Sequence, residues 1–182
     1  MEKLSDTYLI SRIADGEISC FAIIVDRYKN FLLTLIVRIV DNKEDAKDIL
    51  QEVFISVYKN LDKFHQESSF STWIYRIAYN ASINFLRKNN ISFIDIDQIE
   101  LENSQDSFID NNESLKKENL YIALDNAIKK LAPSEKALVI LFYRQEKSIA
   151  QCGEILSMSE SNIKVKLHRI RKKLSVLMNQ EI

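Results

Sequence analysis

Glycine and proline are scarce in this chain. Its 182 residues include two glycines, Gly16 and Gly153, and one proline, Pro133. Tight turns and β-hairpins rely on these two residue types, so their scarcity argues against a β fold with many short turns. Apolar residues make up 46% of the chain, which is enough for a buried core, and the length allows one or two domains. The composition therefore favours an all-α globular protein.

Long apolar runs are also missing. No run approaches the roughly 20 apolar residues that a membrane-spanning helix needs. Residues 1–17 lack the uninterrupted apolar core of a signal peptide. We therefore expect a cytoplasmic protein with no membrane insertion.

Patterns typical of metal sites and catalysis are absent as well. Cys20, Cys152, His65 and His168 are isolated, and no spacing suits a zinc site. The sequence has no glycine-rich phosphate loop, and no Ser, His and Asp form a recognisable local triad. We expect the two cysteines to be small buried apolar side chains. Nothing in the sequence supports an enzyme, a metal site or a cofactor.

Charge is unevenly distributed along the chain, although the net charge is only −1. Residues 1–88 hold 12 basic and 12 acidic side chains, residues 89–118 hold 2 and 8, and residues 119–182 hold 11 and 6. The middle segment is rich in Asn, Asp and Ser and has weak periodicity, so we interpret it as a flexible acidic linker. This predicts two small helical domains, 1–88 and 119–182, joined by a linker at 89–118.

Four helices are predicted in the first domain. Apolar residues recur at steps of three and four over residues 6–15, 19–40 and 42–61. A fourth helix is expected to start near Ser71 or Thr72, because either side chain can cap it.

The third of these helices has an acidic face. Asp41, Asp45, Asp48 and Glu52 follow one another at steps of four, three and four, which places them on one side. Such a face can simply be solvated, with some benefit from the helix dipole. It can also dock a basic partner helix.

The fourth helix combines aromatic and cationic side chains. Its expected core face is Trp73, Ile74, Ile77, Ala78, Ala81 and Phe85, and a separate polar stripe is formed by Arg76, Asn80, Asn84 and Arg87. The aromatic residues Phe64, Phe70, Trp73, Tyr75 and Tyr79 are interleaved with Lys63, Arg76, Arg87 and Lys88. Single-stranded nucleic acid binds by stacking bases on aromatics while cations follow the backbone. Each aromatic alone is better interpreted as core, but the set together favours a single-strand-binding surface.

The second domain ends in a predicted helix-turn-helix. Helices are expected over 121–131 and 133–145, with Pro133 in a first turn, and then over 148–156 and 159–177. The last helix has a buried stripe of Ile163, Leu167, Ile170 and Leu174. Its remaining surface is cationic, with Lys164, Lys166, Arg169, Arg171, Lys172 and Lys173. A solvated basic helix is the simpler interpretation, but the preceding turn favours a helix that enters a major groove.

These segments resemble a known family. DAKDILQEVFISVYKNLDKF and FSTWIYRIAYNASINFLRK resemble conserved region 2 of bacterial RNA polymerase sigma factors, and SMSESNIKVKLHRIRKKL resembles the recognition half of their region 4. The short length of the chain and the segment FSTWIYRIA resemble those of the extracytoplasmic-function (ECF) group. The resemblance covers roughly residues 18–88 and 119–176, and the two motifs in this order are far more specific than either alone.

The resemblance implies roles for particular residues. The residues implied to contact the largest subunit of core RNA polymerase are Asp45, Asp48, Gln51 and Glu52. The residues implied to capture flipped bases at the minus-ten promoter element are Lys63, Phe64, Ser69, Phe70, Ser71, Thr72, Arg76, Asn80, Asn84, Arg87 and Lys88. The residues implied to recognise the minus-thirty-five element are Ser159, Ser161, Asn162, Lys164, Val165, Lys166, His168, Arg169 and Lys172. The linker resembles one that threads the polymerase's active-site and RNA-exit path, and an anti-sigma factor is the expected regulator.

The sequence departs from the family pattern within the helix-turn-helix. Gln151, Cys152 and Gly153 stand where Glu-Ile-Ala is usual, Ser157 stands where the turn usually has glycine, and Asn162 stands where threonine is common. Gly153 lowers helix stability by up to about 1 kcal/mol relative to alanine, but it allows closer packing at the turn.

Two other functions remain compatible with the residues. One is a helix-turn-helix repressor or activator that binds duplex DNA without polymerase. The other is a helical adaptor whose charged faces contact proteins only.

Overall fold

The computed structural model describes residues 4–65, 67–89 and 115–180, and every regular element within them is a helix. This confirms the predicted all-α class. The elements are α1 (Asp6–Ala14), α2 (Ser19–Val40), α3 (Lys43–Lys59), the 3-10 turn η1 (Leu61–Lys63), α4 (Phe70–Lys88), α5 (Leu115–Lys129), α6 (Pro133–Val139), the π-helical turn η2 (Ile140–Arg144), α7 (Ile149–Leu156) and α8 (Glu160–Asn179). Most of the expected acidic linker, residues 90–114, lies outside the described residues.

Side-chain caps fix where the N-terminal helices begin. The Asn42 side chain accepts hydrogen bonds from the backbone N–H groups of Glu44 and Asp45, at 2.9 and 3.2 Å, which starts α3. The cap of α4 is Ser69, whose hydroxyl accepts from the Thr72 backbone at 3.1 Å. The expectation that Ser71 or Thr72 caps this helix is therefore wrong by two or three residues.

The buried face of α4 is also rotated from the one expected. Tyr75, Ser82 and Leu86 are buried, whereas Trp73 and Phe85 are only half-buried. The reason is that α4 packs against α7 as well as against α2 and α3, so neighbours from both halves of the chain define its core face. Periodicity within the helix could not reveal the contact with α7.

The C-terminal helices differ from expectation at two boundaries. Helix α5 begins at Leu115, six residues before the predicted start. The three residues that follow Leu115 are Lys116, Lys117 and Glu118, which all have high helix propensity. The helix that begins at Pro133 widens into the π-helical turn η2, where the Gln145 backbone N–H donates to the carbonyl of Ile140 at 2.9 Å. Such π turns often mark functional positions.

The predicted helix-turn-helix is formed by α7 and α8. Ser157 ends α7 in the left-handed region, with φ of 57°, and Ser159 caps α8. Gly153 is necessary for this close turn, because a Cβ at that position would lie 2.7 Å from the Met158 carbonyl oxygen. The departure of Gly153 from the family pattern is thus explained by packing.

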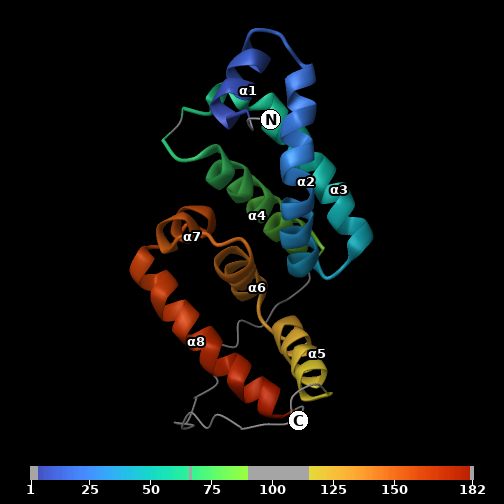
Figure 1. Cartoon of the computed structure of the whole chain (residues 1–182), viewed down its shortest axis with the longest axis vertical. Helices are drawn as coiled ribbons and strands as arrows, with labels where there is room; N and C mark the ends of the chain where they lie inside the picture. The colour runs from blue at the N-terminus through green and yellow to red at the C-terminus, as the bar shows by residue number, and fades with distance from the viewer. Residues whose placement is uncertain (1–3, 66, 90–114, 181–182) are drawn as a thin grey trace.

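The two halves of the chain pack together. Helix α7 lies against α4, and α6 lies against α2, so helices from both ends of the sequence are side by side (Figure 1). A single cluster of buried apolar residues runs through both halves, from Leu9 and Ile24 to Ile163 and Ile170. The N-terminal and C-terminal units therefore share one continuous core.

Replacing Gly153 with alanine should destabilise the protein, although alanine is the better helix former. The added methyl overlaps a backbone oxygen that cannot move without opening the turn. Overpacking of this kind costs about 1–3 kcal/mol, against a propensity gain of about 1 kcal/mol. Urea unfolding should show a net loss of stability.

The matched variant is Ser157→Gly, four residues along the same turn. Its left-handed backbone suits glycine, so the free energy of unfolding should rise by up to about 1 kcal/mol. Stabilisation by G153A would show that the turn is not closely packed.

Candidate nucleic-acid interface

The acidic face of α3 is open to solvent. Asp48, Gln51 and Glu52 are exposed and Asp45 is half-buried. Ile55 lies on the same face, one turn beyond Gln51, and 48% of it is exposed. The sequence analysis missed Ile55, although its position outside the apolar stripe was a signal. Asp41 leaves this face, because its carboxylate pairs with Lys136 of α6.

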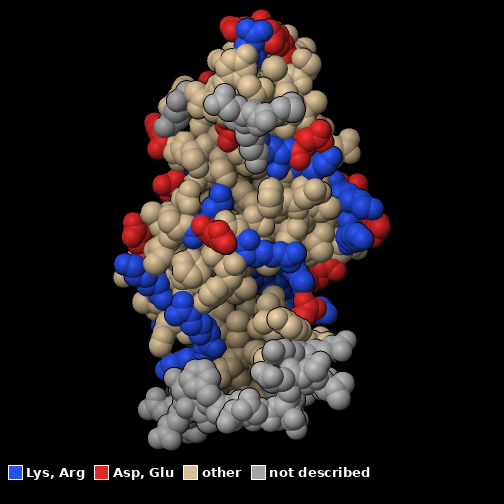
Figure 2. Space-filling view, viewed as in Figure 1, with Lys and Arg blue, Asp and Glu red and all other residues tan. Residues whose placement is uncertain are grey.

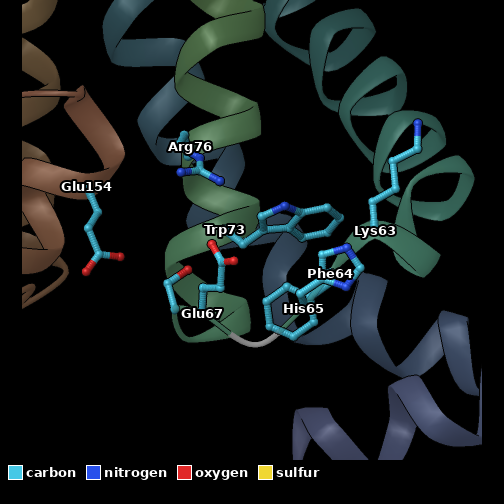
Figure 3. A pocket seen from close by; sticks show the side chains of 8 residues that line it. Lys63, Phe64, His65, Glu67, Trp73, Arg76 and Glu154 are labelled. Carbon is cyan, nitrogen blue, oxygen red and sulfur yellow. The ribbon is translucent and has the colours of Figure 1, made fainter.

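A cavity of about 270 Å³ lies where η1, the following loop and α4 meet (Figure 3). It is lined by Lys63, Phe64, His65, Glu67, Ser68, Trp73, Arg76 and Glu154. Three of these, Lys63, Phe64 and Arg76, belong to the predicted minus-ten set. Figure 3 shows Trp73, Phe64 and His65 gathered together, with Glu154 on the separate ribbon of α7.

Aromatic rings form the wall of this cavity. The ring centroids of Phe64 and Trp73 are 5.4 Å apart, those of Phe64 and Phe70 are 5.4 Å apart, and those of Phe70 and Trp73 are 5.6 Å apart. Phe70 is buried and packs against the rings of both Phe64 and Trp73. Phe64 and Trp73 are half-buried and can offer an edge or face to an unstacked base.

The predicted minus-ten residues are divided between surface and interior. Arg76, Asn80, Asn84, Arg87 and Lys88 are exposed along one side of α4, as the stripe predicted. Thr72 is buried and its hydroxyl lies 2.8 Å from that of Ser69, so both side chains are engaged in the helix cap. Ser71 accepts a hydrogen bond from Lys147 at 2.6 Å.

Tyr75 is not available for stacking in this structure. Only 2% of it is exposed, and its hydroxyl donates to the Gln145 side chain at 2.8 Å. Burial raises the pKa of this phenol well above its usual value, so it remains a neutral hydrogen-bond donor. The earlier grouping of Tyr75 with the stacking aromatics does not describe this conformation.

Helix α8 presents most of the predicted minus-thirty-five residues to solvent. Ser159, Ser161, Asn162, Lys164, Val165, His168, Arg169 and Lys172 are exposed, and Lys166 is half-buried. Behind these residues, Ile163, Leu167 and Ile170 are buried, as predicted. Leu174, the fourth member of the predicted stripe, is only half-buried. Asn162, Val165, Lys166 and Arg169 line one side of a hollow of about 310 Å³. Val165 adds an apolar surface among the cations, suited to a thymine methyl group.

Two cations of α8 have partners within the protein. Lys173 pairs with Glu135 at 2.9 Å, and both side chains are largely buried. The Arg171 guanidinium donates to the Tyr143 hydroxyl at 2.6 Å. Neither residue belongs to the predicted contact set. Figure 2 shows Lys and Arg atoms on the side of the molecule where α8 lies.

Comparison with known proteins matches both halves of the chain to sigma-factor families. Residues 24–91 match Sigma-70 region 2 and residues 121–174 match Sigma-70 region 4. The ECF RNA polymerase sigma factor SigW of Bacillus subtilis (strain 168) is 34% identical over 173 residues, which are 91% of this chain and 92% of that protein. The chain belongs to the ECF family of RNA polymerase sigma factors.

Other similarities agree with this family. The ECF RNA polymerase sigma-E factor of Escherichia coli (strain K12) is 38% identical over 104 residues, 56% of this chain and 54% of that protein. The fold resembles CnrH in its complex with the cytosolic domain of CnrY, with a TM-score of 0.67, 19% identity, and coverage of 96% and 97% of the two chains. It also resembles RpoE of Bartonella quintana in complex with the anti-sigma factor NepR, with a TM-score of 0.62, 18% identity, and coverage of 87% and 96%.

The family assignment decides between the functions left open by the sequence. A repressor with only a helix-turn-helix would account for α7 and α8 but not for the region 2 match over α2, α3 and α4. This ECF sigma factor carries both regions in one chain. A sigma factor is therefore favoured over the stand-alone regulator and over the protein-only adaptor.

The described residues of this sigma factor hold no group of three or more His, Cys, Asp or Glu side chains suited to a metal ion. None of their helices is long and apolar enough to cross a membrane. Cys152 is fully buried, and burial raises its pKa to about 11, which keeps it a thiol; the prediction for this residue is confirmed. Cys20 is only half-buried, so its prediction holds in part.

Proposed function

We propose that this sigma factor binds core RNA polymerase through α3, opens the minus-ten element with the loop before α4 and with α4 itself, and binds the minus-thirty-five element with α8. The observation that carries the proposal is the pairing of regions 2 and 4 in one chain whose helices expose an acidic face, an aromatic-walled cavity and a cationic face. Each surface suits a different partner: a basic protein helix, unstacked bases and duplex phosphates.

The division of labour follows the predicted domains. Residues 1–88 would form the region 2 domain and residues 119–182 the region 4 domain, with the acidic segment 89–118 between them. The linker's excess of six negative charges suits a channel that otherwise holds RNA.

Under this proposal the chain catalyses no reaction and needs no cofactor, since the polymerase supplies the chemistry. The protein would act in the cytoplasm, where RNA polymerase and the chromosome are. An anti-sigma factor is proposed as a partner, supported by the fold shared with RpoE, which is described in complex with one. The decisive test is to add the purified chain to core polymerase with genomic DNA and to sequence the RNA 5′ ends. Defined start sites that depend on the chain would support the function.

Charge reversal on α3 should weaken polymerase binding. The variant Asp48→Lys with Glu52→Lys places two cations where the proposed partner surface is basic, and both side chains are exposed, so the fold should persist. We expect the affinity for core polymerase to fall at least about tenfold, measured by fluorescence anisotropy.

The matched control is Asp15→Lys with Asp26→Lys, which reverses two exposed carboxylates on α2 and before it. It changes the net charge equally and should leave affinity near that of the wild type. If both variants bind core polymerase with the same affinity, the acidic face of α3 is not the docking surface.

Removing Lys63 and His65 should impair strand opening more than duplex binding. Both side chains are exposed at the cavity, and capture of an unstacked base must offset an unstacking cost of a few kcal/mol. The alanine double variant with polymerase should show reduced permanganate reactivity of minus-ten thymines, with near-normal affinity for the duplex promoter. Lys29→Ala with Lys59→Ala serves as the control, and normal melting by K63A/H65A would contradict the assignment.

Removing two cations from α8 should lower the salt dependence of duplex binding. If Lys166 and Arg169 each contact a phosphate, the alanine double variant should reduce the slope of log K against log salt by up to about 1.8. The same control, Lys29→Ala with Lys59→Ala, removes two exposed cations elsewhere and should change the slope less. An unaltered slope in K166A/R169A would mean that these side chains do not contact phosphates.

A further inference from the structure

A buried carboxylate of α6 lies against the cationic helix α8. Glu135 is in the first turn of α6 and is only 8% exposed. Its Oε2 atom accepts hydrogen bonds from the backbone N–H of Ala132 at 2.8 Å and from the ammonium of Lys173 at 2.9 Å. One oxygen atom therefore caps the start of α6 and pairs with α8. Because a buried charge without a partner is strongly unfavourable, this pair keeps the Lys173 ammonium at α6.

By its position, Lys173 belongs to the same row of cations as two proposed phosphate contacts. Lys166, Arg169 and Lys173 follow one another at steps of three and four, which places them on one side of α8. Lys166 is half-buried and Arg169 is exposed. The Lys173 side chain is only 12% exposed, and its partner is Glu135. A row of three cations thus offers two of them to a phosphate backbone.

The hollow beside α8 brings Glu135 close to the other two cations of this row. Its lining residues are Glu135, Met158, Asn162, Val165, Lys166 and Arg169. Among these six described residues, Glu135 is the single carboxylate. A negative charge in a partly enclosed site repels a phosphate more strongly than the same charge in open water. The hollow therefore disfavours a phosphate at the side where Glu135 lies.

The position of Lys173 along α8 gives this neutralisation a consequence for DNA binding. Lys173 follows Asn162 by 11 residues, which is about 16 Å along a helix that rises about 1.5 Å per residue. A recognition helix reads bases with its N-terminal residues, so Asn162 is near the bases and Lys173 is far from them. A free cation at Lys173 would bind the DNA backbone without requiring that the N-terminal residues enter the groove.

Phosphate contacts and base contacts contribute differently to recognition. Contacts with phosphates add affinity for every sequence, whereas contacts with base edges distinguish one sequence from another. A third phosphate contact from the row would raise the affinity for all duplexes alike. Neutralising Lys173 restricts the phosphate contacts of this row to Lys166 and Arg169, which are closer to the residues that face the bases.

We propose that Glu135 is a specificity-determining residue, which withholds the Lys173 ammonium from DNA and so lowers the affinity of α8 for duplexes that lack the promoter element. Glu135 acts through Lys173 and through the charge that it places in the hollow, so it is a positioning residue and does not itself touch a base. The effect on promoter choice rests on the function proposed above, whereas the capture of Lys173 does not.

The test uses the full-length variant Glu135→Gln. The glutamine carbonyl can still accept from the Ala132 backbone, so the start of α6 is kept while the charge opposite Lys173 is withdrawn. Binding is measured by anisotropy with a fluorescein-labelled, mixed-sequence duplex of about 20 base pairs over a range of salt concentrations. We expect the slope of log K against log salt to steepen by up to about 0.9, the value for one additional phosphate contact, and the affinity in about 50 mM salt to rise roughly fivefold.

A second variant separates the charge of Lys173 from a disturbance of the fold. Glu135→Gln with Lys173→Met removes both charges and should return the slope to that of the wild type, whereas a structural effect of E135Q would persist in the double variant. The control is Glu17→Gln, which withdraws the carboxylate from Arg12 in an exposed ion pair before α2 and changes the net charge equally. It should leave the slope nearly unchanged, with circular dichroism confirming that each variant is folded.

A second measurement tests promoter choice with the complete polymerase. Each variant is combined with core polymerase on a promoter mapped from RNA 5′ ends, and transcripts are counted as unlabelled mixed-sequence duplex is added. The concentration of competitor that halves transcription should be roughly threefold lower for E135Q than for the wild type. E135Q/K173M should recover the resistance of the wild type, because neither variant protein then presents the extra cation.

Particular results would overturn the proposal. An unchanged or shallower salt slope for folded E135Q would show that Glu135 does not withhold Lys173 from DNA. A steeper slope that persists in E135Q/K173M would assign the effect to an altered fold. A reversed slope with unchanged sensitivity to competitor would show that the capture of Lys173 does not affect promoter choice. Failure of the proposed function appears separately, as an absence of transcripts that depend on the wild-type chain, and it leaves the slope measurement valid.

Discussion

The arrangement of this sigma factor depends on the ion pair between Lys136 and Asp41. The lysine side chain is almost fully buried among α6 and its neighbours, so the only favourable conformations keep a carboxylate beside it or expose it to water. That requirement fixes α6 against the end of α2. Helix α7 follows the π turn after α6, and its own packing on α4 is a second contact between the two halves of the chain.

The exposed charges of α3 and of α8 each lie on a helix whose opposite side is buried. The exposed carboxylates of α3 lie over a buried stripe that includes Ala46, Ile49 and Val53. The cations of α8 are sorted by direction: Lys173 and Arg171 turn toward Glu135 and Tyr143, while Lys164 and Arg169 remain exposed. One basic helix thus contributes contacts within the C-terminal unit on one side and exposes cations to solvent on the other. Electrostatics and packing use opposite sides of the same element.

Much of the candidate site was predictable because its signals are local. The spacing of Asp48 and Glu52 gives an acidic face, and the stripe from Arg76 to Arg87 is exposed as its periodicity indicated. Other features were wrong or missed where a distant neighbour decides. Tyr75 looked like a stacking ring, but it is buried and contacts Gln145 and Lys147 in the turn before α7. Glu154 carries no local signal for the cavity, since it reaches the cavity only through the contact of α7 with α4.

The sequence by itself determined the helical class, the order of the helices, the helix-turn-helix and the faces exposed on α3 and α8. These follow from apolar periodicity, capping side chains and charge spacing, which act over a few residues. Only the tertiary structure decided which side of α4 is buried, why Gly153 is needed beside Met158, and which polar groups meet across the two units. Those outcomes depend on contacts between segments about 70 to 95 residues apart, or on the exact closeness of two backbones, and neither is encoded in local periodicity.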